Sequence, residues 1–496
     1  MVKRRKKNNR KRCASKGFEG RERRPRKINA STEFGTCTEQ ITPFGGLLGL
    51  IKFLDLVQLE EIFDKLYIAP WRRVKLGHYR MVVGILMLLF IGFNRLWHFT
   101  YIRLDAIMCG FFQLTKLPVA STFWRYVDSV GINQAHSLLR VMRVLRERVW
   151  QLCGLSYETI HLSTDTTVTT LYGNQQGGRR GHNRRERGKK GYRPVLCFID
   201  ETREYLLGKL RKGETIGGEE VAKFIKEIKG QLPGCVKNVL FRGDGEFFSW
   251  QSVCACIEEG FDFIIANKGA SPPFDPKAWY RPKKSKPYEY NSCVYKPTGW
   301  KVFCRFVAMR IPKEMNLPPG KPVQFELFED DRYTYRIFCT SLKGKPPKII
   351  AEYDKRADVE NLVGESKREG LEAIPSAKFK NNYAYFQIVM LAYNIWRYFK
   401  MMAELSNHSS TSDTSDPTHD SLKGLTENLI RIARLKLLLI GAKVVYHSKD
   451  KVKYSIMDSR TPGLMHFLDY LDKARSKVRP WLEGNLWPCR FSLNIE

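Results

Sequence analysis

The sequence predicts an α/β protein in which a mixed β-sheet core carries a β-rich insertion and follows an all-α N-terminal domain. Two observations predict this fold class. Apolar residues recur three and four positions apart from about 45 to 152, which is the period of an amphipathic helix. After Tyr157 the period changes to two, and strand-like and helix-like segments then alternate, as in a sheet covered by helices.

The chain is long and strongly basic. Its 496 residues suggest about three structural units. Lys and Arg total 84 against 51 Asp and Glu, which gives a net charge of +33. Such a surface concentrates polyanions, so we expect nucleic acid as the partner. The alternatives are a soluble basic protein without a special partner, or a protein that binds anionic membranes.

Cysteine use and hydropathy exclude other classes. The 12 cysteines contain no C-x-x-C pair, so we expect no structural zinc site. The most apolar run, residues 81–93, is shorter than the roughly 20 residues of a membrane span, and it is predicted to be a buried helix. No secretory signal opens the chain, so the expected location is the cytoplasm.

Residues 1–40 are expected to form a basic, disordered arm, because they contain few apolar side chains to bury. The alternative is a solvated tail with no specific use. Residues 41–154 are expected to form a helical DNA-binding domain. Within it, Ser121 is predicted to cap a helix whose first turns present Trp124 and Arg125 to DNA. The alternative is an ordinary capped helix with its aromatic residues in the core.

The core elements follow in the order βββαβαβ. The expected elements are a strand at 160–168, strands at 194–199 and 205–209, a helix at 219–231, a strand at 238–242, a helix at 250–259 and a strand at 261–266. Three meandering strands followed by βα crossovers are the architecture of the ribonuclease-H-like fold. We assign this catalytic core to residues 155–267 and 343–403.

The remaining parts differ in composition from the core. Residues 268–342 are rich in proline turns and short β-like runs, and are predicted to be an inserted β subdomain. Trp279 and Trp300 in this insertion are candidates for stacking on a flipped base, with a role in the hairpin core as the alternative. Residues 404–420 are a polar linker, and 421–496 form a C-terminal segment assigned to dimerisation or DNA contact.

Three acidic residues lie in separate settings that suit a shared site. Asp165 lies within S-T-D-T-T-V-T-T on the first strand, Asp244 closes V-L-F-R-G-D-G, and Glu360 lies on a helix predicted at 348–368. Each acid also has an ordinary structural explanation when it is taken singly. Asp165 could point to solvent from the polar face of its strand, Asp244 could cap a helix, and Glu360 could lie on a solvated helix face. Gathered carboxylates repel one another, and their hard oxygen ligands suit two Mg²⁺ or Mn²⁺ ions.

The helix of Glu360 carries a stripe of further polar residues. Positions seven apart on a helix return to within about 20°, so Tyr353, Glu360 and Lys367 share one stripe and Arg356 flanks it. We predict that Tyr353, Arg356 and Lys367 bind phosphates on either side of the metal-binding carboxylate.

A glycine-rich loop between the first two strands is crowded with cations. Its basic residues are Arg179, Arg180, Arg184, Arg185, Arg187, Lys189, Lys190 and Arg193. So many like charges repel unless phosphates screen them, and the loop is predicted to be a DNA clamp. A solvated hairpin is the alternative.

These motifs resemble a known family. The spacing Y-x2-R-x3-E-x6-K over 353–367 is similar to the Y-R-E-K signature of DDE transposases of the insertion-sequence four superfamily. The segments S-T-D-T-T-V-T-T-L-Y-G-N-Q-Q-G and G-Y-R-P-V-L-C-F resemble its thirteen-eighty group. The resemblance covers about 155–400. It departs from the family where N-Q-Q-G-G-R-R-G-H-N lacks an acidic residue and R-G-D-G-E-F lacks the commoner serine, and neither departure removes a triad acid.

The resemblance implies that Asp165, Asp244 and Glu360 are a catalytic, metal-binding triad. It further implies a bacterial, nucleoid-associated transposase that binds terminal inverted repeats, cleaves them and joins the 3′ ends to target DNA. A homodimer acting on paired ends of double-stranded DNA, with no membrane, is the expected assembly. The alternatives are a metal-dependent nuclease of the same fold without strand transfer and a non-catalytic DNA-binding relative.

Overall fold

The computed structural model describes residues 28–181, 186–282, 287–313, 332–408, 422–448, 451–456 and 461–482. The chain divides into two units, residues 1–39 and 40–496. In the first unit, a turn is closed by the amide of Thr32, which donates to the carbonyl of Asn29 at 3.0 Å. Most of the predicted basic arm, 1–27, lies outside the described residues.

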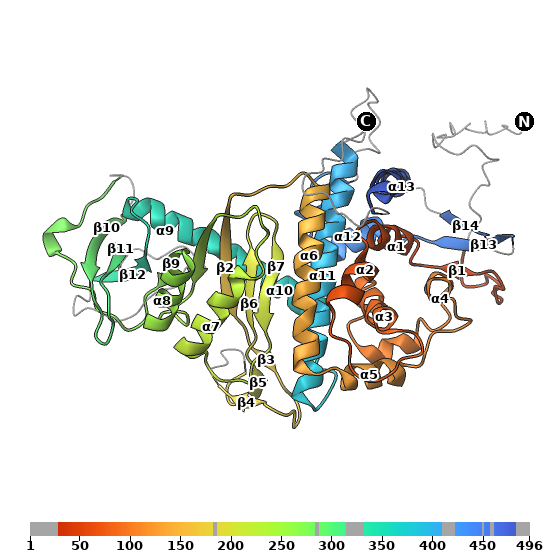
Figure 1. The fold of residues 1–496 in the computed structure, drawn as a ribbon, viewed down its shortest axis with the longest axis horizontal. Coiled ribbons are helices and arrows are strands. Elements are labelled where there is room, and N and C mark those ends of the chain that lie inside the picture. Colours follow the sequence, from red (N-terminus) through yellow and green to blue (C-terminus); the bar gives the residue numbers. More distant parts are fainter. Residues whose placement is uncertain are drawn as a thin grey trace, which may run out of the picture. The chain divides into compact units, whose positions relative to one another are not determined.

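The second unit is built around an eight-stranded mixed sheet (Figure 1), with the strand order β10-β11-β12-β9-β8-β2-β6-β7. The strands are β2 (Thr159–Thr166), β6 (Val195–Ile199), β7 (Glu204–Lys209), β8 (Asn238–Gly243), β9 (Asp262–Ala266), β10 (Glu289–Tyr295), β11 (Cys304–Pro312) and β12 (Tyr333–Thr340). The pairs β2–β8 and β8–β9 are parallel, and the other neighbours are antiparallel. Together with the helices α7 (Gly218–Lys229) and α8 (Trp250–Glu259), β2 and β6 to β9 confirm the predicted order βββαβαβ. The arrangement is consistent with a ribonuclease-H-like core.

The strands of the expected insertion extend the core sheet. β12 pairs antiparallel with β9, with Phe338 opposite Ala266, and β11 and β10 follow outward. The unpaired edge of β9 would otherwise expose backbone donors and acceptors, which β12 satisfies. The β-rich stretch within 268–342 is therefore continuous with the core sheet, although 283–286 and 314–331 lie outside the described residues.

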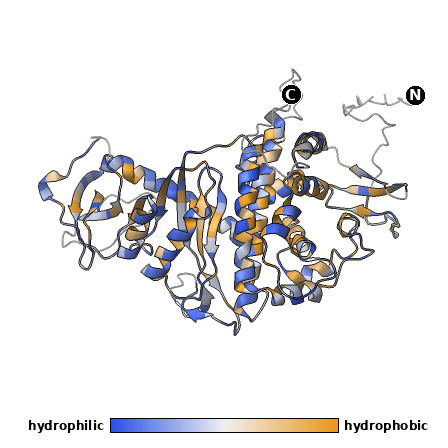
Figure 2. Cartoon of the chain, viewed as in Figure 1, coloured by the Kyte–Doolittle hydropathy of each residue, from blue (hydrophilic) through white to orange (hydrophobic). Residues whose placement is uncertain are grey.

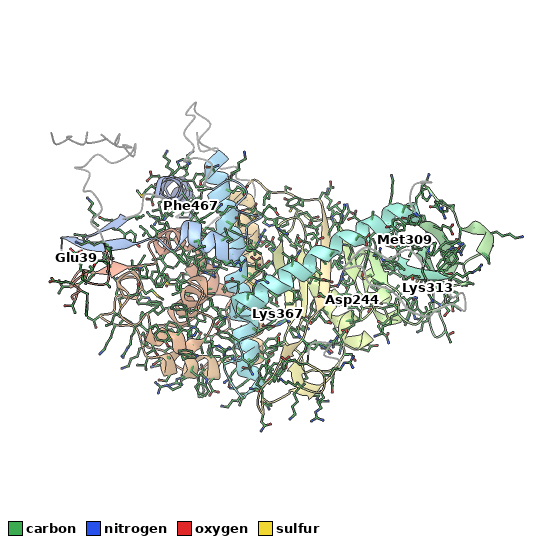
Figure 3. All side chains as sticks on the ribbon, turned by 180° about the vertical axis from the view of Figure 1, so that it is seen from behind. Glu39, Asp244, Met309, Lys313, Lys367 and Phe467 are labelled. Atoms are coloured by element: carbon green, nitrogen blue, oxygen red, sulfur yellow. The ribbon has the colours of Figure 1, made fainter. Side chains whose placement is uncertain are left out.

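Helices cover both faces of the sheet. α7 and α8 lie on one face, and Figure 3, seen from behind, shows the helical run from α9 (Pro346–Asp354) crossing the other. Side chains alternate along the strands. Leu240 and Ile264 therefore belong to the cluster that includes α9, whereas Phe241 and Phe263 belong to the larger core.

The N-terminal part of the second unit is helical, as predicted. Its helices are α1 (Leu47–Leu56), α2 (Leu59–Leu66), α3 (His78–Phe90), the 3₁₀ turn η1 (Leu96–Thr100), α4 (Ala106–Phe112), α5 (Ala120–Ser129) and α6 (Ile132–Leu152). Figure 2 shows the hydrophobic residues concentrated along these helices and along the strands. Every residue of α3 from Met81 to Phe90 is buried, which confirms the predicted buried helix. No helix among the described residues is long and apolar enough to cross a membrane.

One expectation for this region is wrong. Ser121 does not cap α5, because the helix already begins at Ala120 and its N-cap is Val119, which makes no side-chain cap bond. Phe123 is buried and stacks on Phe99 with ring centroids 3.8 Å apart, but Trp124 remains 39% exposed. The aromatic pair is therefore split, one ring in the core and one at the surface.

A buried carboxylate joins the helices to the sheet. Glu204 of β7 is fully buried and accepts hydrogen bonds from Arg146 Nε and Trp150 Nε1 of α6, each at 2.8 Å. The hydroxyl of Tyr398, on α11 (Phe379–His408), also bonds to it. Helices α6 and α11 lie side by side against the sheet (Figure 1). This network fixes the helical layer relative to the strands that carry the candidate site.

The C-terminal part contains helices and a second small sheet. Its elements are α12 (Ile430–Leu437), β13 (Ala442–Ser448), β14 (Lys451–Ile456) and α13 (Thr461–Leu482). Strand β13 pairs with β14 and with β1 (Ile41–Thr42), so chain segments 400 residues apart share one sheet. α11 continues to His408, and the rest of the predicted linker, 409–420, lies outside the described residues.

Candidate active site

One predicted triad acid, Asp165, lies on β2, and another, Asp244, directly follows the neighbouring strand β8. β2 and β8 are parallel, and their described register pairs Ser163 with Arg242. Asp165 lies two residues beyond Ser163, and Asp244 lies two residues beyond Arg242, just after the end of β8, so the two acids lie near the ends of adjacent strands. Paired residues of parallel strands project to the same face of a sheet. The two carboxylates therefore meet at the carboxyl end of the central strands, where α/β sheets bind ligands.

The third acid joins them from a helix. Glu360 is exposed and lies in the first turn of α10 (Asp358–Ser366). Burial raises the pKa of Asp165 to about 6, the Arg356 guanidinium opposes this rise, and the charges of Asp244 and Glu360 add to it. Asp244 and Glu360 thus both lie within electrostatic range of Asp165. Burial also raises the pKa of Asp244, and Arg356 again opposes the shift.

Arg356 is the cation at the centre of this cluster. It is 7% exposed. Its guanidinium donates to the carbonyl of Thr164 at 2.6 and 3.1 Å and to Asp165 Oδ1 at 3.0 Å. In this arrangement Arg356 fixes the end of β2 and neutralises part of the acidic cluster.

The single helix predicted for 348–368 is wrong in detail. A 3₁₀ turn, η3 (Lys355–Ala357), separates α9 from α10, and a π-helical turn, η4 (Lys367–Leu371), follows. Three residues at 120° in place of 100° rotate the two helix faces by about 60° relative to each other. Tyr353 points into the core, 4% exposed, because it packs in one cluster with Phe338 of β12, whose ring lies 4.4 Å from its own, whereas Glu360 is exposed.

Lys367 lies at the start of η4. Figure 3 labels it on the helical run that crosses the sheet, and labels Asp244 as well. Its Nζ donates to the carbonyl of Val168 at 2.9 Å and pairs with Glu372 at 3.3 Å. Lys367 therefore ties η4 to the chain just after β2. Phosphate binding by Tyr353, Arg356 and Lys367 stays a prediction, and in this state the polar ends of Arg356 and Lys367 bond to protein groups.

A fourth carboxylate at the site was missed in the sequence. Glu246 accepts a hydrogen bond from Thr166 Oγ1 at 2.8 Å and pairs with Arg193, whose Nε lies 3.2 Å away. The backbone amide of Glu246 donates to Asp244 Oδ1 at 2.9 Å. Glu246 therefore links both aspartate-bearing segments. Its signal in the sequence was the departure R-G-D-G-E-F, which places an acid two residues after Asp244.

The donor set fits a divalent cation. The three triad acids offer only carboxylate oxygens, which Mg²⁺ and Mn²⁺ prefer. Burial is the main cause of the raised pKa of Asp165, and the charges of Asp244 and Glu360 add to it. In the part of the chain that the structure describes, no three acidic, His or Cys side chains are already grouped closely enough to hold one metal ion. The positive charge beside Asp165 comes from Arg356 instead.

The predicted clamp loop is only partly described. Strands β3 (Thr169–Thr170), β5 (Lys190–Tyr192) and β4 (Arg179–Arg180) form a small sheet next to β2, and Arg184 and Arg185 lie outside the described residues. Arg179 pairs with Glu214, and Lys189 pairs with Glu186 at 2.6 Å. Arg180 and Lys190 are exposed.

The two tryptophans proposed for base stacking pack against the protein. The Arg310 guanidinium lies 4.3 Å from the ring of Trp279, and Phe248 lies 5.1 Å from the ring of Trp300. Both indoles are half-buried against the core. Stacking on DNA by Trp279 or Trp300 stays a prediction.

A strongly basic groove lies along one side of α5. It has a volume of about 640 Å³. The cations that line it are Arg72, Arg73, Lys75, Arg103, Lys116 and Arg125. None of the described residues that line this basic groove is acidic. Arg125 is the only one of these six that the sequence singled out, because the others come from loops whose approach to α5 depends on tertiary structure.

The fold and the site define an enzyme with a mixed-sheet core and acidic residues gathered at the carboxyl ends of its central strands. A family model described as "Transposase DDE domain group 1" matches residues 26–462. The chain therefore belongs to this family of DDE transposases and is a transposase.

Two further comparisons complete this result. No curated protein matches the chain. A solved structure described as the piggyBac transposase synaptic complex with hairpin DNA is similar at 11% identity and a TM-score of 0.43, over 80% of this chain and 84% of that chain.

Proposed function

We propose that this transposase binds the terminal inverted repeats of its mobile element, hydrolyses the DNA at their ends and joins the freed 3′ ends to target DNA. In the first step a water oxygen bonds to phosphorus while the bond to the 3′ oxygen breaks. In the second step the oxygen of that 3′ hydroxyl bonds to a phosphorus of the target while the target's own bond between that phosphorus and its 3′ oxygen breaks, which leaves a free 3′ hydroxyl on the target strand. Asp165, Asp244 and Glu360 are the proposed catalytic and metal-binding residues.

The observation that carries this proposal is the convergence of three carboxylates from three elements. Asp165 and Asp244 occupy corresponding positions at the ends of β2 and β8, and Glu360 on α10 lies within electrostatic range of Asp165. Two divalent cations bound there would supply an activated hydroxyl and stabilise the departing oxygen. No nucleophilic side chain is needed for this chemistry.

The neighbouring side chains have positioning roles in this proposal. Arg356 holds Asp165 and the preceding carbonyl in place, and Glu246 holds Thr166 and Arg193. Bound cations would neutralise Asp165 in place of Arg356. The Arg356 guanidinium could then bind a DNA phosphate, whose geometry it matches. Lys367 at the far end of the same helical run would contact the next phosphates.

We also propose the finer assignment and the assembly. The Y-R-E-K spacing over 353–367 favours the insertion-sequence four superfamily and its thirteen-eighty group. Two DNA ends must be brought together for joining, which favours a homodimer acting on paired ends. The net charge of +33 supports double-stranded DNA as the partner at every step.

The test is Asp165→Asn, which keeps the size of the side chain and removes its charge. With a duplex that carries an element end, we expect end binding to persist and Mg²⁺-dependent cleavage to fall at least a thousandfold, because one metal ligand loses its charge. Asp262→Asn is the matched control, since Asp262 lies at the start of β9 and bonds only to Ser341 Oγ among its described hydrogen bonds. It should cleave like the wild type.

Each contrary result has a distinct meaning. Cleavage by Asp165→Asn at the wild-type rate would refute the triad. Cleavage by the wild type without insertions in a plasmid assay would indicate a nuclease without strand transfer. Binding that never yields a metal-dependent product would indicate a non-catalytic relative.

A further inference from the structure

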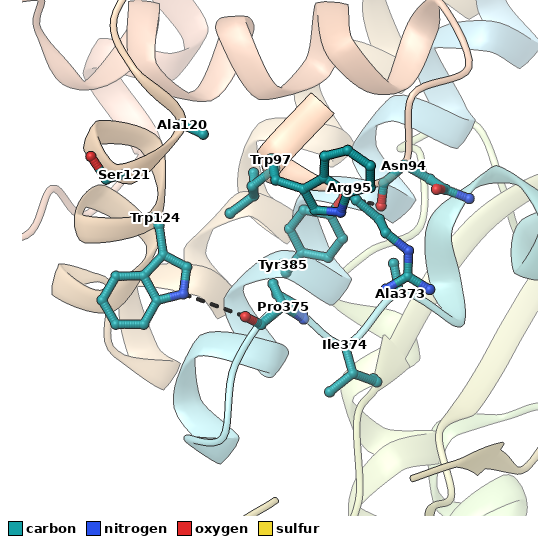
Figure 4. A pocket seen from close by; sticks show the side chains of 11 residues that line it. Asn94, Arg95, Trp97, Ala120, Ser121, Trp124, Ala373, Ile374, Pro375 and Tyr385 are labelled. Carbon is teal, nitrogen blue, oxygen red and sulfur yellow. Dashed lines mark hydrogen bonds between the residues drawn. The ribbon is translucent and has the colours of Figure 1, made fainter. Parts of the chain in front are cut away.

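An aromatic pocket lies on the side of α5 that faces away from the basic groove. It has a volume of about 360 Å³, within the usual range of about 300–1,000 Å³ for ligand pockets. Its lining includes Arg95, Trp97, Ser121, Trp124, Pro375 and Tyr385 (Figure 4). We call it the aromatic pocket.

Two indoles form the walls of this pocket. In Figure 4, Trp124 lies on one side and Trp97 and Tyr385 on the other. Trp97 is 53% exposed and Trp124 is 39% exposed. Leaving this much apolar surface in water is unfavourable in free energy. Exposed aromatic surface gathered around a cavity marks a binding site.

The pocket is held in shape by hydrogen bonds. Trp124 Nε1 donates to the carbonyl of Pro375 at 3.4 Å, and the hydroxyl of Tyr385 donates to the carbonyl of Asn94 at 2.9 Å. These bonds join α5, the segment before η1, the segment after η4 and α11. The cavity is therefore a product of the whole helical layer and exists before a ligand binds.

The charge around the pocket indicates an anionic ligand. Arg95 at the rim is exposed and makes no ion pair with the described residues. α5 presents Ser121 and Trp124 to the aromatic pocket and, one position on, Thr122 and Arg125 to the basic groove. A ligand could therefore place phosphates against the cations of the basic groove and a flat ring against the indoles of the aromatic pocket.

The pocket also lies at a defined distance from the candidate active site. Glu360 and the pocket residue Ala373 are thirteen residues apart, a separation of about 20 Å at the helical rise of about 1.5 Å per residue. That length corresponds to about six base-pair steps of 3.4 Å. One DNA end is long enough to reach both sites.

From these observations we propose that the aromatic pocket binds a single nucleobase that has left the stack of a DNA end, with its ring between Trp97 and Trp124. Arg95 and Ser121 supply polar contacts to its edge or its phosphate. The inference rests on the proposed function, because it takes an element end as the ligand. It adds a base-binding site remote from Trp279 and Trp300, the residues singled out in the sequence.

The test is a mismatch scan in metal-free buffer. The probe is a duplex that carries an element end, with one mismatched base moved through the positions near the cleavage site, and affinity is measured by fluorescence anisotropy. An unpaired base costs less to extrude, so a mismatch tightens binding only where the base leaves the stack. We expect about tenfold tighter binding at one position, within about six base pairs of the cut.

Variants of the pocket provide the decisive comparison. Trp97→Ala and Trp124→Ala should each abolish the gain at that position, since stacking on an aromatic ring contributes about tenfold or more per base. Ser121→Trp should do the same by filling the pocket while both indoles remain. Trp71→Ala is the matched control, because Trp71 is 102% exposed and lies outside the pocket, and it should retain the gain. Thermal unfolding identifies any variant that fails to fold.

The proposal is overturned if no position tightens with the wild type, or if the gain survives in Trp97→Ala and Trp124→Ala alike. Failure of the proposed function has a different signature. A protein that cleaves with Mg²⁺ but shows no mismatch position loses only the pocket assignment. A protein that shows the mismatch position but never cleaves retains the pocket and loses the catalytic proposal. A wild type that binds no element end overturns both.

Discussion

Arg356 is the residue on which the metal-free geometry of the site depends most. It is buried, and all its described hydrogen bonds go to Thr164 and Asp165. Arg356→Met would leave Asp165 without its counter-charge, and removal of one partner of a buried pair costs about 3–5 kcal/mol. We expect urea unfolding to report a loss of that size.

The neighbouring Lys355→Met is the control for this prediction. Lys355 precedes Arg356 on the same 3₁₀ turn, but its side chain is 66% exposed and pairs with Glu352 at the surface. Exposed pairs contribute about 0–1 kcal/mol, so the control should change stability little. Equal effects of the two substitutions would show that Arg356 is not the buried anchor of β2.

At the same scale, the sequence predicted the acids but not their surroundings. Asp165 and Asp244 were found because alternation and turn signals place them on strand ends. The burial of Tyr353 was not predicted, because its packing partner Phe338 comes from β12, and a contact between separate elements leaves no mark in the apolar period. The role of Glu246 was not predicted either, because its partners Thr166 and Arg193 come from distant segments.

At the scale of elements, helix α11 contains a buried cation whose titration is testable. Lys400 is fully buried, and its Nζ donates to the carbonyl of Asn428 at 2.6 Å and to that of Thr426 at 3.4 Å. Burial, helped by the charge of Arg397, lowers the pKa of Lys400 to about 7. Lys400 thereby ties α11 to the segment before α12 as a largely neutral amine above pH 7.

The sign of the pH dependence follows from this shift. Between pH 7 and about 10.5 the unfolded chain binds a proton at Lys400 that the native protein does not, so stability rises with pH. The slope from this residue approaches about 1.4 kcal/mol per pH unit. We expect Lys400→Met to remove that slope in urea unfolding between pH 7 and 9.5.

The control for the titration is Lys436→Met on α12, which leaves Lys400 in place and should leave the slope unchanged. If the stability of the wild type and that of Lys400→Met rose equally steeply with pH, the lowered pKa of Lys400 would be contradicted. The experiment reads stability alone, so its result does not depend on the proposed catalytic site.

The order of the core elements was predictable because each strand carries its own alternation and each helix its own period. The continuation of the sheet from β9 into β12, β11 and β10 was not predictable, because pairing between strands more than 60 residues apart depends on which edge remains open. The contact of β1 with β13 escaped prediction for the same reason.

At the scale of the whole second unit, the proposed function involves two regions joined by the buried helical layer. The acidic cluster lies on the sheet, and the basic groove and the aromatic pocket lie on the two sides of α5. The Glu204 network holds α6 and α11 to β7. In the proposed function, this buried network would fix the distance between DNA bound along α5 and the carboxylates.

The basic groove predicts how DNA affinity depends on salt. Each phosphate that a cation neutralises contributes about −0.9 to the slope of log K against log salt on duplex DNA. Arg73→Ala combined with Arg125→Ala removes two of the six cations that line the groove, and should reduce the magnitude of the slope by about 1.8. Affinity should fall most at 50 mM salt and least at 200 mM, as measured by anisotropy with duplex DNA.

The matched control is Lys226→Ala combined with Lys229→Ala on α7, which removes the same charge from residues paired with Glu258 at 2.7 Å and Glu259 at 3.2 Å. If both double variants reduce the slope equally, the effect belongs to net charge, and the groove has no special share in binding DNA.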